Sequence, residues 1–234
     1  MPEPHAEPDS ADPSDLDALV RRVDPDRWLS SRFVADPQAR ADVIAIYAYD
    51  HELARAPRVA SNPLMGEIRL TWWREVLDEV FEGRPVRHHP TAQALAEVVR
   101  RRGLPREPLE AMIDGRYREL DPEPLSSQDA EILARDTAGS AAGLAVMILD
   151  PAADRDAAAA GGAAWALARL IGAGKGVGAR LDLAAARRGA RALSVAAFPA
   201  VLHAALAASR AAGRQVSDFE ARARLIWASA TGRI

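Results

Sequence analysis

Helical periodicity of the apolar residues constrains this chain more than any other feature. Between residues 63 and 83, intervals of three and four residues separate Leu70, Trp73, Leu77 and Val80. That spacing places all four on one face of an α-helix. No segment alternates apolar and polar residues as a half-buried strand does. The sequence therefore predicts an all-α fold, with these side chains buried: Tyr47, Trp73, Leu77, Met112 and Leu144.

Proline and glycine divide the chain into predicted helices. Pro37, Pro63 and Pro90 stand where helices begin, because the fixed φ of proline suits the first turn. Gly103 stands where one ends. The predicted helical segments are 14–20 with Ser14 as its cap, 37–55, 63–83, 90–103, a segment from 105 that includes Met112, 127–149, 156–171, 195–212 and 217–229.

The first residues differ from the rest in composition. Residues 1–14 are rich in proline and acidic residues, and we expect a disordered tail followed by one helical domain over residues 15–234. The tail lacks the basic and apolar regions of a secretory signal. No apolar run approaches the ~20 residues of a membrane span. These features favour a cytoplasmic protein.

Charge and cysteine content exclude several kinds of site. The chain has no cysteine, which excludes disulfides and thiolate metal sites. Its 30 basic and 33 acidic groups give a net charge of −3, so nucleic acid is not an expected partner. The segment 172–178 is rich in glycine but lacks the spacing of a phosphate-binding loop.

One predicted helix concentrates polar residues beside its apolar stripe. Asp50, His51 and Glu52 lie within one turn, so they cannot all face solvent. The pattern is consistent with two hypotheses: these side chains line a polar pocket, or they form hydrogen bonds between helices. Arg69 and Arg74 flank Trp73 in the next helix. We expect at least one of these arginines to bridge to another helix, with Asp50 or Glu52 as a candidate partner.

Three stretches of the chain carry a family resemblance. They are residues 31–49, with Arg40 and Tyr47-Ala-Tyr; residues 66–95, with Ile-Arg69-Leu-Thr-Trp-Trp73-Arg74; and residues 104–139, with Asp136-Thr-Ala-Gly. In this order and spacing they resemble the squalene/phytoene synthase family. The resemblance implies an isoprenoid-synthase-type helical bundle around a central cavity. The candidate pocket residues are Arg40, Tyr47, Asp50, His51, Glu52, Arg69, Trp73, Arg74 and Asp136.

The resemblance also implies what the cavity lacks. Enzymes of that family join two prenyl diphosphates, which Mg²⁺ ions hold on two facing DxxxD motifs. The aligned positions here are Ala54, Arg58, Gly172 and Gly176, none of which offers a carboxylate. We therefore expect no catalytic residue, metal or cofactor. The resemblance further implies a somewhat shortened C-terminal part, with most of one helix missing between Asp182 and Phe198.

The branch of the family that shows this loss contains assembly factors of respiratory complex I. The leading hypothesis is a pseudoenzyme of that type, with a partner in a membrane-associated respiratory complex and a position that is cytoplasmic or peripheral at the inner face of the membrane. One alternative is an active Mg²⁺-dependent prenyltransferase that uses other ligands, namely Asp50, Glu52, Asp136 and Asp182. The other is a module that binds an isoprenoid or lipid in the cavity.

Overall fold

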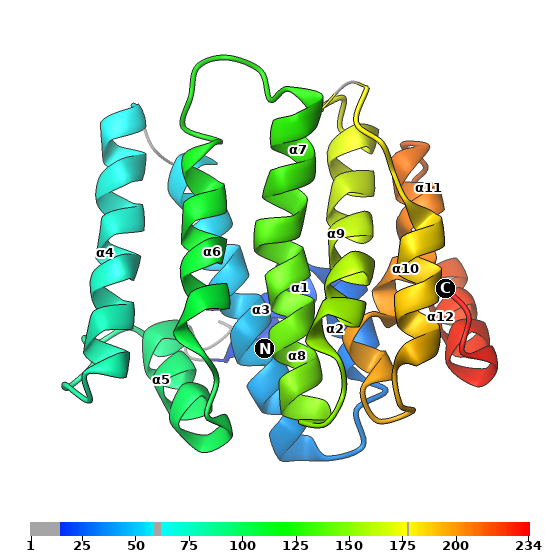
Figure 1. The fold of residues 1–234 in the computed structure, drawn as a ribbon, viewed down its shortest axis with the longest axis horizontal. Helices are drawn as coiled ribbons and strands as arrows, with labels where there is room; N and C mark the ends of the chain where they lie inside the picture. Colours follow the sequence, from blue (N-terminus) through cyan, green and yellow to red (C-terminus); the bar gives the residue numbers. More distant parts are fainter. Residues whose placement is uncertain (1–14, 59–61, 177) are drawn as a thin grey trace, which may run out of the picture.

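Helices make up most of the protein in the computed structural model, which describes residues 15–58, 62–176 and 178–234 (Figure 1). No strand occurs in these ranges, which confirms the all-α prediction. The tail predicted over residues 1–14, with the predicted cap Ser14, lies outside the described residues. Asp15 caps the first helix, where its carboxylate accepts the backbone N–H of Ala18.

Six helices form the first half of the chain, and proline marks the start of several. Pro25, Pro37, Pro63 and Pro90 are each the first residue of a helix, as their fixed φ favours. Gly103 ends α5 with a φ of +61°, a backbone conformation that glycine adopts without strain. The six helices are α1 (Leu16–Val23), α2 (Pro25–Ser31), α3 (Pro37–Arg58), α4 (Pro63–Phe81), α5 (Pro90–Arg102) and α6 (Arg106–Tyr117).

The second half begins with one long rod that has a π-helical turn in its middle. Ser126 caps the rod, one residue before the predicted start. The elements of this half are α7 (Ser127–Ala134), the π-helical turn (Arg135–Gly139), α8 (Ser140–Leu149), α9 (Arg155–Gly172), α10 (Leu183–Ala192), two 3-10 segments (Phe198–Ala200 and Leu202–Leu206), α11 (Ala207–Ala211) and α12 (Asp218–Thr231).

Two expectations for the C-terminal part are wrong. The helix predicted over 195–212 is divided into two 3-10 segments and the short α11, because Pro199 cannot donate in a helix interior. The helix expected to be missing between Asp182 and Phe198 is present as α10. The Asp182 carboxylate caps it by accepting the backbone N–H of Ala185 at 2.8 Å.

The rod over Ser127–Leu149 corrects a third expectation. By length and hydropathy it is apolar enough to span a membrane, although no such segment was predicted. In the structure, 67% of its most apolar window is buried against other helices. A buried core helix has the same composition as a membrane span, so this rod serves as core in the fold described here.

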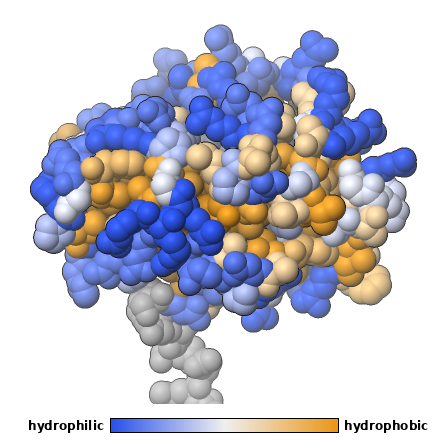
Figure 2. Space-filling view, turned by 60° about the horizontal axis from the view of Figure 1, so that its bottom comes forward, coloured by the Kyte–Doolittle hydropathy of each residue, from blue (hydrophilic) through white to orange (hydrophobic). Residues whose placement is uncertain are grey.

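Apolar residues also reach the surface, and a band of them crosses the face seen from the lower end of Figure 1 (Figure 2). The large exposed hydrophobic residues fall into two groups. Leu64, Met65 and Ile68 lie on α4, and the other group is Val195, Phe219, Ile226 and Trp227, on α12 and in the loop after α10. These two groups lie at opposite ends of the molecule (Figure 1).

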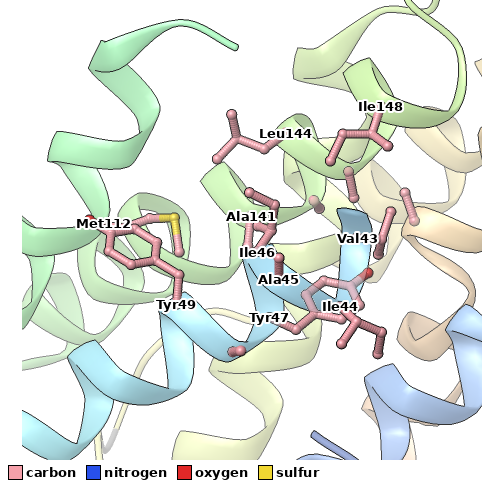
Figure 3. Packing of buried hydrophobic residues seen from close by; sticks show 14 of the residues in the cluster. Val43, Ile44, Ala45, Ile46, Tyr47, Tyr49, Met112, Ala141, Leu144 and Ile148 are labelled. Carbon is pink, nitrogen blue, oxygen red and sulfur yellow. The ribbon is translucent and has the colours of Figure 1, made fainter. Parts of the chain in front are cut away.

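The hydrophobic core is built around α3, which contacts α1, α4, α5, α6 and α8 (Figure 3). Ile46 and Tyr49 of α3 are fully buried. The Tyr49 ring meets Trp73 edge to face at 5.3 Å, and its hydroxyl donates to the Leu109 carbonyl at 3.1 Å. The core predictions are confirmed, since all five named side chains are buried: Tyr47, Trp73, Leu77, Met112 and Leu144.

Candidate functional site

A small central pocket of about 200 Å³ lies between α2, α3, α6, the rod and α9. Ala54 and Arg58 of α3 line one side of it. Ala173 and Lys175, which follow α9, line another. The pocket therefore lies between the two segments that align with the metal-binding motifs of the resembling enzymes. Its charged lining residues are Asp24, Arg27, Asp50, Arg58, Arg116, Glu119, Arg169 and Lys175.

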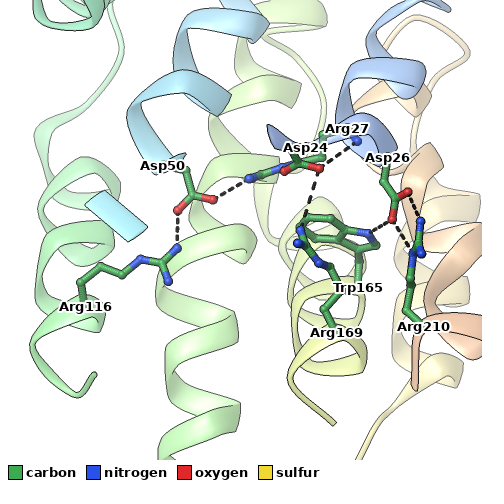
Figure 4. Close-up of polar contacts among 8 residues, drawn as sticks. All are labelled: Asp24, Asp26, Arg27, Asp50, Arg116, Trp165, Arg169 and Arg210. Atoms are coloured by element: carbon green, nitrogen blue, oxygen red, sulfur yellow. Dashed lines mark hydrogen bonds and ion pairs between the residues drawn. The ribbon is translucent and has the colours of Figure 1, made fainter. Parts of the chain in front are cut away.

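Asp50 is the centre of a buried ionic network in this pocket (Figure 4). Its carboxylate accepts from Arg27 Nη2 at 2.7 Å and from Arg116 Nη2 at 2.8 Å. Asp24 accepts from Arg27 Nε at 2.5 Å, and Glu119 accepts from Arg116 Nη1 at 2.7 Å. Burial acts to raise the pKa of Asp50, but the two guanidinium groups outweigh it and hold that pKa well below its ordinary value. Asp50 is therefore ionised, and each of its carboxylate oxygens binds an arginine.

A second buried carboxylate joins three distant parts of the chain. Asp26 accepts from Trp165 Nε1 at 3.0 Å and from Arg210 Nη2 at 2.6 Å (Figure 4). Burial opposes ionisation of Asp26, but the hydrogen bonds from Arg210 and Trp165 lower its pKa. The Arg27 guanidinium lies 4.8 Å from the Tyr47 ring and 4.9 Å from the Trp165 ring. Cation–π contacts thus connect the two carboxylate centres.

His203 is buried beside these aromatic rings. Its ring lies 5.0 Å from Trp165 and 6.4 Å from Tyr47, both edge to face. Among the residues that the structure describes, neither ring nitrogen has a hydrogen-bond partner. Burial, followed by the repulsion of the Arg27 guanidinium, lowers the pKa of His203 to about 3. The imidazole is therefore neutral near pH 7 and serves as an apolar wall of the site.

Positive charge exceeds negative charge in the pocket. Five lining residues are cationic and three are acidic. The three acidic side chains already bind Arg27 and Arg116, and Arg169 lies 4.0 Å from Asp24. Within the described part of the chain, Arg58 and Lys175 form no ion pair. The pocket therefore has an excess of positive charge at these two residues.

These residues do not fit the Mg²⁺ ions that the family resemblance implies. Magnesium is held through carboxylate oxygens, which Ala54, Arg58, Gly172 and Gly176 lack. A Cβ atom on Gly172 would overlap the carbonyl oxygen of Arg210, so the backbone there leaves no space for an aspartate. In the described ranges, no three His, Asp or Glu side chains are grouped to hold a metal ion.

The structure separates the candidate pocket residues into several places. Asp50 and His51 line the central pocket. Glu52, Arg69 and Trp73 line a separate pocket of about 330 Å³ between α3 and α4. Tyr47 lies in the core beside the Arg27 guanidinium.

The other candidates lie further away. Arg40 lines a pocket between α1, α3 and α5, where its guanidinium donates to the Val34 carbonyl. Arg74 forms an ion pair with Asp114 of α6. The expected bridge to another helix is thus present, but neither Asp50 nor Glu52 is the partner. Asp136 lines a surface groove and pairs with its neighbour Arg135.

That groove is larger than the three pockets described above. It has a volume of about 1000 Å³ and runs between α6, the rod, α9 and α10. Small side chains form much of its lining, including Gly139, Gly143, Ala159 and Ala163. Asp182, the last of the alternative metal ligands, also lines this groove. The four proposed ligands therefore lie in three different pockets.

Several residues of the central site were not among the sequence candidates. Arg27, Arg116 and Trp165 are the main ones, and each is buried. The signal for Arg27 was the segment Asp24-Pro-Asp-Arg27, where two acidic residues and a proline begin a helix directly before an arginine. Arg116 and Trp165 have no local signal, because their partners lie 66 and 139 residues away in the sequence.

Comparisons with known proteins agree on one family. Residues 20–172 match the squalene/phytoene synthase family model. The chain is 30% identical over 132 residues to a Bos taurus protein named NADH dehydrogenase (ubiquinone) complex I, assembly factor 6, a match that covers 56% of this chain and 39% of that protein. The Homo sapiens protein of the same name is 28% identical over 103 residues, which is 44% of this chain and 30% of that protein. The chain thus spans about two fifths or less of the length of these relatives.

The fold resembles that of a solved enzyme. Squalene synthase HpnC from Alicyclobacillus acidocaldarius superposes with a TM-score of 0.59 at 20% identity. The superposition covers 93% of this chain and 92% of that one. At this identity the similarity establishes the isoprenoid-synthase helical fold.

Proposed function

This chain belongs to the squalene/phytoene synthase family, and from that premise we propose that it is a non-catalytic member that acts as an assembly factor for respiratory complex I. The observation that carries the proposal is the chemistry of the central pocket. Where family enzymes need carboxylates for Mg²⁺, Arg58 and Lys175 place positive charge, and Gly172 leaves no space for an acidic side chain. The names of the relatives supply the assembly role.

The carboxylates that remain argue against prenyl transfer. Departure of a diphosphate concentrates negative charge, which clustered metal ions must stabilise. Asp50 is bound by two arginines, so a metal ion would have to displace Arg27 and Arg116. Glu52 and Asp136 line other pockets. Asp136 shares its groove with Asp182, but within the described residues no third His, Asp or Glu is grouped with them to hold a metal ion, so we propose that the chain performs no condensation.

Two measurements on the full chain test this proposal. Deletion of its gene should lower the amount of assembled complex I on native gels, together with NADH:ubiquinone oxidoreductase activity, and the wild-type gene should restore both. The purified chain, incubated with labelled farnesyl or geranylgeranyl diphosphate and Mg²⁺ or Mn²⁺, should give no C30 or C40 product. An unchanged amount and activity of complex I after deletion would reject the assembly role. A metal-dependent C30 or C40 product would reject the proposal that the chain is non-catalytic.

Binding of an isoprenoid or lipid is a second candidate function, and the groove beside α9 favours it. The central pocket, at about 200 Å³, is smaller than the roughly 300–1,000 Å³ of sites that enclose drug-sized ligands. The groove of about 1000 Å³ is large enough, and small apolar residues form part of its lining beside charged side chains such as Glu107 and Arg180. Saturable binding of a labelled isoprenoid alcohol, lost in Gly143→Trp, would support this function, and the absence of binding would reject it.

A further inference from the structure

An apolar stripe runs along the exposed side of α12. Phe219, Ile226 and Trp227 expose 82%, 59% and 57% of their surfaces. At about 100° per residue, these three side chains and the exposed Ala223 and Ala230 fall within a stripe about 100° wide. The opposite face of the helix packs on the protein. The stripe is therefore an outward face that the described chain leaves uncovered.

Arginines border this stripe on both sides. Arg222 precedes it around the helix, and Arg224 follows it. The C-terminal end of α12 lies beside α10, where Arg187 Nε donates to the Ile234 carbonyl at 3.1 Å. α10 contributes two further exposed arginines, Arg188 and Arg191.

The charge of this region is opposite to that of the rest of the chain. Residues 183–234 contain eight arginines and two acidic residues, whereas residues 1–182 contain 22 basic and 31 acidic residues. No acidic residue occurs between positions 183 and 217. Both acidic residues, Asp218 and Glu220, stand in the first turn of α12, where Glu220 binds Arg214 and Arg224. The exposed arginines of α10 and α12 therefore lie at the same end of the molecule as the apolar stripe, where Figure 1 places the two helices.

The shape of this end distinguishes between possible occupants. Val195, in the loop after α10, is 94% exposed. Neither it nor the three large α12 side chains line any of the cavities described above. At these exposures Val195 and Phe219 protrude into solvent, whereas the anchoring side chains of a peptide-binding site lie in a groove. A fluid, planar surface needs no matching shape, and aromatic and aliphatic side chains bordered by arginine are typical of helices that lie in a membrane interface.

We propose that α12 and the adjacent end of α10 form a peripheral docking surface for an anionic lipid bilayer. Phe219, Ile226 and Trp227 enter the interface, and the arginines contact lipid phosphates. Tryptophan favours this depth, because its ring is apolar and its N–H is polar. The inference is independent of the role in complex I assembly, since it concerns the surface and not the pocket.

Co-sedimentation of the full chain with vesicles tests the proposal. Vesicles of phosphatidylcholine mixed with phosphatidylglycerol should bind the chain, and vesicles of phosphatidylcholine alone should bind it more weakly. Raising the salt from 0.1 M to 1 M shortens the Debye length from about 10 Å to about 3 Å and should release part of the bound protein. The double variant Phe219→Ser/Trp227→Ser should bind at least roughly tenfold more weakly.

Two matched controls complete the experiment. Leu64→Ser/Ile68→Ser removes two exposed apolar side chains, 61% and 52% exposed, from α4 at the opposite end of the molecule, and should bind as wild type does. Arg188→Glu/Arg191→Glu should weaken binding, whereas Arg22→Glu/Arg100→Glu, with the same change in net charge, should do so much less. Circular dichroism and the melting temperature establish that each variant is folded.

The outcomes separate this proposal from its alternatives. Failure to bind either kind of vesicle would overturn it, as would equal losses in the α4 and α12 variants. If the α12 variant loses a captured protein partner but binds vesicles normally, the surface is a protein interface and the lipid proposal is wrong. Complex I levels after gene deletion are measured separately, so either proposal can fail alone.

Discussion

Arg27 and Asp50 meet at 2.7 Å in the interior of the protein, where the Arg27 side chain exposes 6% of its surface and the Asp50 side chain 4%. They come from α2 and α3, 23 residues apart. A buried pair is costly to desolvate, so it is retained where its geometry is good and both groups have further partners. Asp24 and Arg116 supply those partners. The ion pairs of Asp50 with Arg27 and Arg116 therefore hold α2 and α6 against α3.

Removal of Asp50 should therefore destabilise the protein strongly. Asp50→Ala leaves the charges of Arg27 and Arg116 without their shared acceptor, and we expect a loss of about 3–5 kcal/mol in the free energy of unfolding. Urea denaturation near pH 7 measures it. Glu52→Ala is the matched control, because Glu52 pairs with the half-exposed Arg55 one turn away and should cost no more than about 1 kcal/mol. Equal costs for the two variants would contradict the network.

His203 should make stability depend on pH. Its pKa is about 3 in the folded protein and about 6.5 in an unfolded chain, so the unfolded state binds the proton first as pH falls. The contribution of His203 to the free energy of unfolding is therefore fully present above pH ~6.5, where the ring is neutral in both states. Between pH 6.5 and pH 3 this free energy falls by about 1.4 kcal/mol per pH unit, because the unfolded chain binds the proton and the folded protein does not.

A variant separates the contribution of His203 from that of other groups. His203→Leu removes two buried ring nitrogens that have no hydrogen-bond partner in the described part of the chain. It should therefore match or exceed wild-type stability at pH 7 and lose the slope between pH 6 and pH 4. His88→Leu, at an exposed residue, is the control and should keep that slope. Urea denaturation at several pH values gives the comparison. A wild-type slope that persists in His203→Leu would show that another group titrates.

The sequence predicted the helices well where local chemistry marks their ends. Pro37, Pro63, Pro90 and Gly103 set backbone angles by themselves, so the boundaries near them were predictable. The alanine-rich stretch around α10 contains few residues that set backbone angles in this way, so its structure depends on tertiary packing. Gly189 lies so close to the backbone of Ala157 on α9 that a Cβ would overlap it, a contact that no local pattern shows.

The candidate site was predictable only in part, for a related reason. The positions that lack carboxylates, such as Ala54 and Arg58, follow directly from the sequence. The residues that neutralise Asp50 do not, since Arg116 is 66 residues away and its i+3 partner Glu119 looks like an ordinary surface pair. Long-range ion pairs depend on how helices pack, which a single sequence does not encode in any local pattern.

Restoring the first aspartate pair alone should not restore metal chemistry. Ala54→Asp/Arg58→Asp places two carboxylates beside the central pocket, but the facing segment still contributes Gly172, Lys175 and Gly176. A diphosphate needs metal ions on both sides of the cavity. We expect no C30 product from farnesyl diphosphate with Mg²⁺ in this variant. Formation of a C30 product that depends on Mg²⁺ would show that one carboxylate pair is enough for catalysis, and it would contradict the prediction that both pairs are needed.

The backbone around Gly172 explains why the second pair cannot return by substitution alone. A Cβ at this position would overlap the Arg210 carbonyl, so Gly172→Ala must displace α11 and should cost more than about 2 kcal/mol. Gly143→Ala is the contrasting control, because its Cβ would lie 3.5 Å from the nearest atom, inside a helix where alanine is favoured by up to about 1 kcal/mol. Thermal and urea unfolding of both variants measure the difference. If Gly172→Ala is as stable as wild type, the segment can move away, and an aspartate there would become compatible with the fold. If it is destabilised as expected, close packing of α9 against α11 has replaced the space that a metal-binding side chain would need.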